Sequence, residues 1–404
     1  MNAQPPARIL PLLVLSQFAG TSLWFAGNAA LPDLQLSMGL AASDVAWVTT
    51  AVQLGFIAGT LLFSLLSITD RIAPVRLFLI CSLLGATLNG IIPLAAEGRA
   101  SLLLLRFGTG FFLAGIYPVG MKIAADWFPA GLGKALGFLV GALVLGTALP
   151  HGLRAYLPEG SWKTLLWSTS AIAALGGLLL YTLVPDGPHR KAAAAFQPAA
   201  LKRLAGLRPL RAAAFGYFGH MWELYTFWAL LPALILWNAN YQYEPPVSIA
   251  LWSFLGIGAG AAGCVIGGIA SARRGSARVA RLALCVSGAC CLLFPLLLKA
   301  PAPLFLTYLF IWGAAAAADS PQFSTLVAQA APAEYRGTAL TLVTSVGFAL
   351  TIVSVHFFAW LLERMPHPEL LFLLLAAGPF LGVRALRPLF APVPEKTAAN
   401  EPQP

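Results

Sequence analysis

Two short basic stretches decide the fold of this 404-residue chain: Asp-Arg-Ile-Ala-Pro-Val-Arg at residues 70–76 and Ala-Arg-Arg-Gly-Ser-Ala-Arg at residues 272–278. Each stretch lies between two long apolar segments. Two arginines of the first stretch recur 202 positions later in the second: Arg71 matches Arg273, and Arg76 matches Arg278. Three more matches lie 203 positions apart: Gly110, Pro118 and Pro129 with Gly313, Pro321 and Pro332. Because these offsets equal about half the chain, we infer two copies of one structural unit in the same orientation.

The composition excludes a water-soluble protein. Hydrophobic residues make up 59% of the chain and charged residues only 10%, against about 25% charged residues in soluble domains. A soluble enzyme or a nucleic-acid-binding domain would leave long apolar runs in water. The five cysteines all lie in apolar runs without metal-ligand spacing, so we expect neither a metal site nor a cofactor.

Twelve apolar segments are long enough to cross a bilayer, which takes roughly 20 residues. They occupy approximately residues 9–31, 44–68, 76–95, 101–127, 132–157, 162–184, 212–238, 247–270, 279–298, 303–330, 337–362 and 368–389. The sequence therefore predicts an all-α membrane protein with twelve transmembrane helices in two pseudo-symmetric six-helix bundles. The predicted bundles cover residues 1–184 and 212–390, with a basic linker at 185–211 between them and a disordered tail at 391–404.

The positions of the cations predict the orientation. If the N-terminus is inside, 18 of the 25 lysines and arginines fall in cytoplasmic loops and tails, and five fall in outer loops. This excess obeys the positive-inside rule with both termini in the cytoplasm. The linker carries six of these cations, and we expect it to lie against anionic lipid headgroups. We therefore expect a multi-pass protein of the bacterial cytoplasmic (inner) membrane.

The motifs resemble those of the major facilitator superfamily over the whole chain. Residues 70–76 are similar to the family's basic signature loop, with Asp70, Arg71 and Arg76 kept, and residues 272–278 resemble a second copy with Arg273 and Arg278. Residues 106–110, Arg-Phe-Gly-Thr-Gly, resemble the family's Arg-x-x-x-Gly motif. The resemblance implies a transporter whose first, fourth, seventh and tenth spans line a central cavity. It also implies that the signature-loop residues form a cytoplasmic gate, and that Arg106 faces the cavity and takes part in proton transfer.

Two carboxyl groups lie inside predicted spans, where an ionisable residue is costly and is a functional candidate by default. Glu223 lies about eleven residues into the seventh span, and Asp319 about eleven residues from the inner end of the tenth. At 1.5 Å per residue, both are roughly 16–17 Å from the cytoplasmic boundary. Because loss of contact with water favours the neutral form of a carboxyl group, both are candidates for proton coupling. The alternative for Glu223 is a structural bond to His220 or to a neighbouring arginine.

Polar and aromatic residues follow one face of the first and seventh spans. Gln17, Thr21, Trp24 and Asn28 have the same spacing as Gly216, His220, Glu223 and Phe227. Lipid offers no partner to a polar side chain, so we expect both stripes to face the central cavity. Tyr117, on the same face as Arg106, and Trp312 and Gln322, near Asp319, complete the predicted cavity.

Glycines recur at every fourth position in several segments, as small residues do where helices approach closely in lipid. The series are Gly133, Gly137 and Gly141, then Gly55 and Gly59, then Ala259, Gly263 and Gly267. This spacing suits spans at a moving interface between the halves, and equally suits static packing.

The sequence therefore predicts a secondary active transporter of a small organic solute, working by alternating access and coupled to protons. Import and export stay open. The expected partners are the solute, protons and lipid, with no nucleic acid, and we expect a monomer. A passive uniporter or a transporter-like receptor is the alternative. An integral-membrane transferase is disfavoured, because the chain offers no cluster of catalytic residues and no large extramembrane domain.

Overall fold

The computed structural model describes residues 5–41, 43–128, 131–190, 200–242, 248–365 and 367–390. Within these ranges the side chains of Thr69, Asp70, Leu201, Ala333 and Pro368 are not described. The predicted tail at 391–404 and the middle of the linker, residues 191–199, lie outside the described residues. All regular secondary structure in the described ranges is helical.

The first half of the chain forms nine helices within the described residues. They are α1 (Ile9–Thr21), α2 (Ala26–Met38), α3 (Asp44–Leu65), α4 (Ile68–Arg71), α5 (Pro74–Ala95), α6 (Arg99–Leu113), α7 (Tyr117–Trp127), α8 (Leu132–Tyr156) and α9 (Trp162–Leu183).

The second half follows a short linker helix, α10 (Leu201–Gly206). Its α-helices are α11 (Arg208–Gln242), α12 (Ile249–Arg274), α13 (Ser276–Leu297), α14 (Ala302–Ala318), α15 (Ser320–Ala330), α16 (Arg336–Leu362), α17 (Leu371–Leu375) and α18 (Ala377–Ala385). Short 3₁₀ turns at Ala333–Tyr335, Pro368–Leu370 and Arg387–Phe390 complete it.

The described residues contain eleven helical segments long and apolar enough to cross a membrane. The prediction of a multi-pass membrane protein is therefore confirmed. The one predicted span missing from this set is α11. It is 35 residues long, but the polar side chains of His220 and Glu223 reduce its apolar character.

Four of the eleven segments are interrupted: the last, Leu371–Phe390, at residues 376 and 386, and three others in the middle. The first span divides into α1 and α2 at residues 22–25, the fourth into α6 and α7 at residues 114–116, and the tenth into α14 and α15 at Asp319. In the fourth and tenth spans the second helix begins with a proline in its first turn, Pro118 and Pro321. Proline suits that position because its missing N–H would have no partner in the helix.

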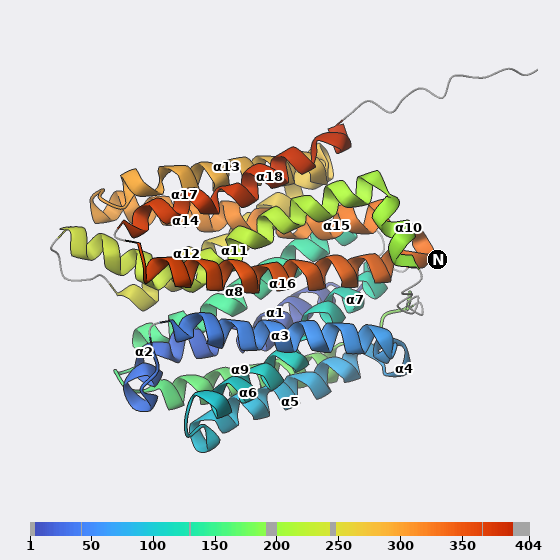
Figure 1. The fold of residues 1–404 in the computed structure, drawn as a ribbon. Helices are drawn as coiled ribbons and strands as arrows, with labels where there is room; N and C mark the ends of the chain where they lie inside the picture. The colour runs from blue at the N-terminus through green and yellow to red at the C-terminus, as the bar shows by residue number, and fades with distance from the viewer. Residues whose placement is uncertain are drawn as a thin grey trace, which may run out of the picture.

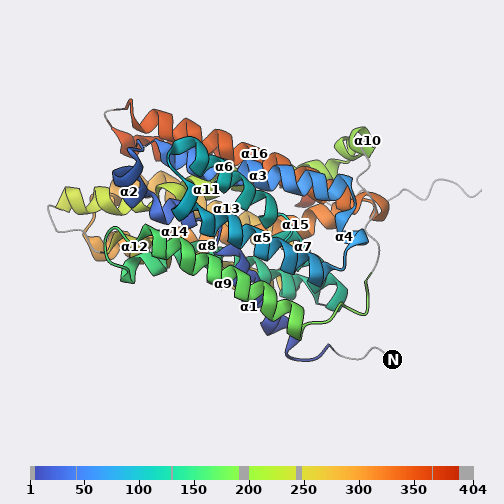
Figure 2. The same ribbon diagram turned by 90° about the horizontal axis from the view of Figure 1, so that it is seen from below.

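The helices form two groups that lie side by side (Figure 1). Helices α1 to α9 pack mainly against one another, and so do α11 to α18. The groups meet chiefly where α8 packs along α12 and where α3 packs along α16. The start of α1, helices α4 and α10, and the end of α18 all lie at one end of the molecule, to the right in Figures 1 and 2.

The two halves repeat one close helix crossing. A side chain at Gly110 of α6 would clash with the carbonyl oxygen of Val52 in α3. The equivalent Gly313 of α14 would clash with the carbonyl oxygen of Gly256 in α12. The glycine match at an offset of 203 therefore reflects the same contact between the second and fourth spans of each unit.

The glycine series serve two different kinds of contact. A Cβ atom at Gly137 would lie 3.2 Å from the Cα atom of Gly268, and one at Gly141 would lie 3.0 Å from the carbonyl oxygen of Ala261. Both contacts join α8 to α12 across the two groups. The other glycines with close neighbours, Gly55, Gly59, Gly263 and Gly267, pack against helices of their own half.

Candidate functional site

A cavity of about 680 Å³ lies between the two groups of helices. Helices α3, α7 and α8 of the first half and α11, α15 and α16 of the second half supply its walls. It opens toward the end of the molecule that carries α4 and α10, where Leu132, Gln329 and Arg336 border it. We call it the central cavity.

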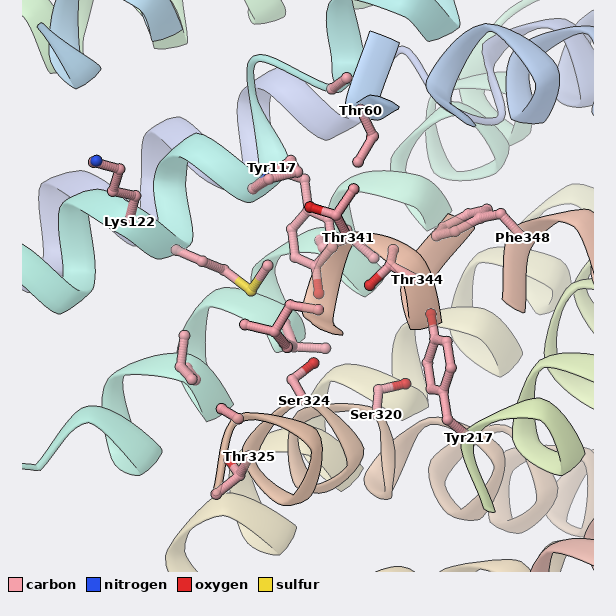
Figure 3. A pocket seen from close by; sticks show the side chains of 18 of the residues that line it. Thr60, Tyr117, Lys122, Tyr217, Ser320, Ser324, Thr325, Thr341, Thr344 and Phe348 are labelled. Carbon is pink, nitrogen blue, oxygen red and sulfur yellow. The ribbon is translucent and has the colours of Figure 1, made fainter. Parts of the chain in front are cut away.

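The walls of the central cavity are rich in hydroxyl groups. Tyr117, Tyr217, Ser320 and Thr344 point into one shared space, whereas the ammonium group of Lys122 extends away from it (Figure 3). Of the lining side chains that the structure describes, three are basic (Lys122, His220 and Arg336) and none is an aspartate or a glutamate.

Aromatic rings close the inner end of the central cavity, and we call them the aromatic layer. The first half contributes Trp24, Phe25 and Phe56, and the second half contributes Tyr225, Trp228 and Phe348. The ring centroids of Trp24 and Phe348 lie 5.6 Å apart, and those of Phe25 and Trp228 lie 6.1 Å apart. All six side chains are at most 4% exposed. The layer therefore joins the two halves between the cavity and the opposite end of the molecule.

Asp319 and His220 form a buried pair beside the central cavity. The Nδ1 atom of His220 lies 2.8 Å from a carboxylate oxygen of Asp319, and these side chains are 2% and 1% exposed. On the other side of the ring, Nε2 lies 2.9 Å from the hydroxyl oxygen of Ser320. His220 and Ser320 both line the cavity. A carboxyl, an imidazole and a hydroxyl thus form a continuous chain from the protein interior to the cavity surface.

Glu223 points into the interior of the second half and does not line the central cavity. Its carboxylate accepts hydrogen bonds from the indole N–H of Trp312 at 2.6 Å and from the hydroxyl of Ser287 at 2.8 Å. The thiol of Cys291 lies 3.5 Å away as a third donor. The bonds come from α13 and α14, so they hold α11 to its neighbours. The alternative bond to His220 or to an arginine is not among these contacts, although the bonds of Glu223 do join helices.

The predicted stripe on α11 faces a different direction from the cavity. The cavity-lining residues of this helix are Tyr217, His220, Met221, Leu224, Tyr225 and Trp228. At 100° per residue, the centre of that face is roughly 100° from the centre of the predicted stripe, and His220 lies at the edge they share. Gly216 packs under Phe323, and Phe227 stacks 4.5 Å from Trp312.

Arg106 is completely buried and does not line the central cavity. Its guanidinium donates to the carbonyl oxygens of Leu23 and Trp24, where the first span is broken, and to the side chain of Asn89. The bond lengths to Leu23 and Asn89 are both 3.0 Å. Arg106 therefore occupies the break behind the aromatic layer, where carbonyl groups left free by the unwound turn compensate its charge.

The polar stripe of the first span lies inside the first half. Gln17 is buried against Gly120 of α7, and the hydroxyl of Thr21 donates to the carbonyl of Gln17. Asn28 donates to the hydroxyl of Thr49 at 2.7 Å. Trp24 belongs to the aromatic layer. The prediction that these four residues line the cavity does not match their positions, because the three polar side chains are buried among the helices of the first half and Trp24 is buried in the aromatic layer.

Of the remaining predicted cavity residues, Tyr117 lines the cavity, whereas Trp312 and Gln322 are buried elsewhere in the second half. The predicted gate residues lie at the end where the cavity opens. Arg71 and Arg76 flank the loop between α4 and α5, and Arg273 and Arg278 flank the turn between α12 and α13, all with exposed side chains. The side chain of Asp70 lies outside the described residues.

Sequence reasoning missed Tyr217 and Ser320 as cavity residues, and it did not separate Tyr225 and Trp228 from ordinary packing. A usable signal existed for Ser320, which is 203 positions from Tyr117 and, like it, directly precedes a proline. Tyr117 begins α7 and Ser320 begins α15, and each of these helices is the second one of a broken span. The repeat that matches Pro118 with Pro321 therefore also marks two equivalent positions on the cavity wall.

Comparison with known sequences identifies the family. The sequence profile of the Major Facilitator Superfamily matches residues 13–355. The chain therefore belongs to the Major Facilitator Superfamily of transporters, and the predicted family membership is confirmed.

Individual relatives are distant. The probable sulfoacetate transporter SauU of Cupriavidus necator is 25% identical, over 90% of this chain and 88% of its own length. The uncharacterized transporter YgaY of Escherichia coli O157:H7 is 29% identical over 193 residues. That match covers 45% of this chain and 47% of YgaY, so the chain spans about half of that relative's length.

The fold is also that of a solved transporter. The crystal structure of the human organic anion transporter MFSD10 superposes with a TM-score of 0.74, covering 95% of this chain and all of MFSD10. The sequences are 16% identical, so the similarity concerns the fold.

Proposed function

We propose that this protein moves a small organic solute across the membrane by alternating access. The observation that carries the proposal is the central cavity, which opens at one end and is closed at the other by rings from both halves. A rocking motion of the halves would separate the aromatic layer and close the opposite end. The names of two similar proteins, a sulfoacetate transporter and an organic anion transporter, support a small organic solute.

The proposed topology has twelve spans, with α11 as the seventh. The ends of the described chain lie at the same end of the molecule as α4 and α10. The excess of lysine and arginine at that end supports a cytoplasmic location. Residues 1–184 and 212–390 would then be the two bundles, and the central cavity would open to the cytoplasm. Similarity to bacterial proteins supports the bacterial cytoplasmic membrane as its location, and we propose a monomer.

The gate is proposed at the signature loops. Asp70 stands at the cytoplasmic end of the second span, where a helix C-terminus makes an acidic group unfavourable and a cationic partner valuable. Arg71, Arg76 and their counterparts Arg273 and Arg278 would supply such partners when the cytoplasmic side closes.

Proton coupling is proposed to act through Asp319 and His220. Of the four candidates, this pair is the one connected to the cavity, through Ser320. Glu223 is surrounded by three donors away from the cavity, and Arg106 is held at the break of the first span, so we propose positioning roles for both.

Uptake into proteoliposomes containing the purified protein tests this function. Labelled sulfoacetate and other small organic solutes are offered with and without an imposed pH gradient. We expect at least one solute to accumulate above its external concentration when the gradient is present. Entry that only equilibrates would favour a passive uniporter, and no protein-dependent flux of any solute would overturn the transport proposal.

A further inference from the structure

We propose that the central cavity binds a small organic anion, and that the chain Asp319–His220–Ser320 takes up one proton when the anion binds. This inference rests on the proposed transport function and adds the charge of the solute and the groups that carry the proton.

The charges on the cavity wall favour an anion. The described lining includes no carboxylate and three basic side chains, of which Lys122 turns its ammonium group away from the cavity. Arg336 stands at the mouth, and His220 lies further in along α11. A solute with a negative group therefore meets Arg336 at the mouth and, further in, His220, which carries a positive charge only when it is protonated.

The hydrogen-bond donors at the inner end also require an acceptor. Trp228 lines the cavity, and its indole N–H is buried without a hydrogen-bond partner. Its side chain is 1% exposed. An indole N–H can only donate, and a buried donor without an acceptor is unfavourable. A carboxylate or sulfonate oxygen close to Trp228 would satisfy it.

The buried pair links the charge of the solute to a proton. With a neutral imidazole and an ionised carboxyl, the pair carries one negative charge beside the cavity and repels an anion. One added proton makes the pair neutral overall and places its positive member, His220, toward the cavity. The anion therefore binds the protonated form better, and by reciprocity the bound anion favours protonation.

The other groups that face this pair do not replace it. Glu223 on the same helix interacts with Asp319 but is held by donors from α13 and α14. Cys264 on α12 and Tyr217 on α11 are the further titratable neighbours. From α15, Phe323 packs against the ring of His220. The residues of α16 and α18 that contact this part of α11, such as Gly347 and Gly378, do not titrate.

The consequence is electroneutral symport of a monoanion with one proton. In a membrane whose proton gradient is directed inward, such coupling drives the solute into the cell. Import is thus the direction that the geometry favours.

The test compares acids with their neutral amides on the detergent-solubilised protein. The probes are benzoate with benzamide, nicotinate with nicotinamide, and propionate with propionamide, first by thermal shift. We expect at least one acid, and not its amide, to stabilise the protein. The affinity of the protein for that acid should fall about tenfold for each unit by which the pH is raised, over the range in which binding takes up one proton. A pH indicator in weakly buffered solution should record that proton.

Variants assign the proton to the pair. The double substitution Asp319→Asn/His220→Gln keeps the size of both side chains and removes both titratable groups, and should bind the acid without proton uptake. Glu223→Gln is the matched control, since this buried carboxyl lies outside the cavity, and it should keep the uptake. Melting temperature and gel filtration check that each variant is folded.

Several results would overturn the inference. They are stabilisation by no acid in the panel, equal binding of acid and amide, or proton uptake that persists in the double variant and disappears in Glu223→Gln. These failures differ from failure of the transport function. Uphill accumulation of a neutral solute would contradict the inference of anion binding but support the transport function. Binding of an anion without flux would support the inference but contradict the transport function.

Discussion

Arg106 keeps a positive charge inside the first half of the molecule by bonding to carbonyl groups. The break between α1 and α2 leaves the carbonyls of Leu23 and Trp24 without helical partners, and the guanidinium fits both. The planar guanidinium serves two carbonyls and Asn89 from two separate nitrogen atoms, whereas a lysine would have to reach all three acceptors from one nitrogen atom. At this scale a single side chain supports both the break in the helix and the adjacent aromatic layer.

Substitution of Arg106 should therefore destabilise the fold. Arg106→Leu leaves three buried acceptors unsatisfied, at about 1–3 kcal/mol for each such group, and Arg106→Lys should recover little of the loss. The melting temperature in detergent measures the effect. Arg364→Gln, at an exposed position, serves as the control and should melt like the wild type. An Arg106→Leu variant as stable as that control would contradict this role.

At the scale of elements, the crossing of α8 and α12 needs glycine on both sides. A Cβ atom at Gly137 or Gly268 would lie 3.2 or 3.1 Å from the Cα atom of the other glycine, so a bulky side chain at either position would strain the contact between the halves. In contrast, a Cβ atom at Gly133, one turn earlier in α8, would meet nothing within 4 Å.

We expect Gly137→Val to lower stability by about 1–3 kcal/mol, the usual cost of overpacking. Gly133→Val is the matched control, because it introduces the same residue into the same helix without a neighbour. The free energy of unfolding or the melting temperature should fall only for Gly137→Val. Equal effects of the two substitutions would mean that helix propensity, and not the crossing, sets the cost.

The aromatic layer is the second feature at this scale, and it should control access from the outer side. Trp24→Ala or Phe348→Ala removes a ring from the contact between α1–α2 and α16. An impermeant maleimide added to the outer face should then label Thr344→Cys several-fold faster. The background carries Cys285→Ser, because Cys285 is the exposed one of the five cysteines. Phe310→Ala, on an exposed ring, is the control, and an unchanged labelling rate in the layer variants would count against the closure.

The lengths of the helices were predictable from the sequence, whereas the side of α11 that faces the cavity was not. The apolar runs follow from the bilayer thickness, so the spans agree with the helices to within a few residues at most ends. The face of α11 did not follow, because a polar residue in a membrane helix can turn toward a neighbouring helix as well as toward a cavity. Glu223 does the former, with Trp312 and Ser287. The break in the first span involves backbone contacts of Arg106, which sequence periodicity does not contain.

At the scale of the whole molecule, the repeat in the sequence corresponds to a repeat in structure. The matched glycines Gly110 and Gly313 make the same crossing in each half, and Tyr117 and Ser320 open equivalent helices on the cavity wall. The family and the multi-pass character were predictable because they follow from features that extend over the whole sequence, namely the repeated motifs and the long apolar segments. The chain Asp319–His220–Ser320 was only partly visible, since its members are brought together by the packing of α11 on α15.

The central claim is that the two halves move relative to one another and expose the cavity to each side in turn. Distances between spin labels in lipid bilayers test it most directly. One pair, Lys134→Cys with Glu334→Cys, spans the end where the cavity opens, and the other, Tyr156→Cys with Arg364→Cys, spans the opposite end. All four side chains are exposed. Two conformations should be populated, with the first distance shorter and the second longer in the outward-facing form. A single distance at each end, unchanged by pH or solute, would contradict the account.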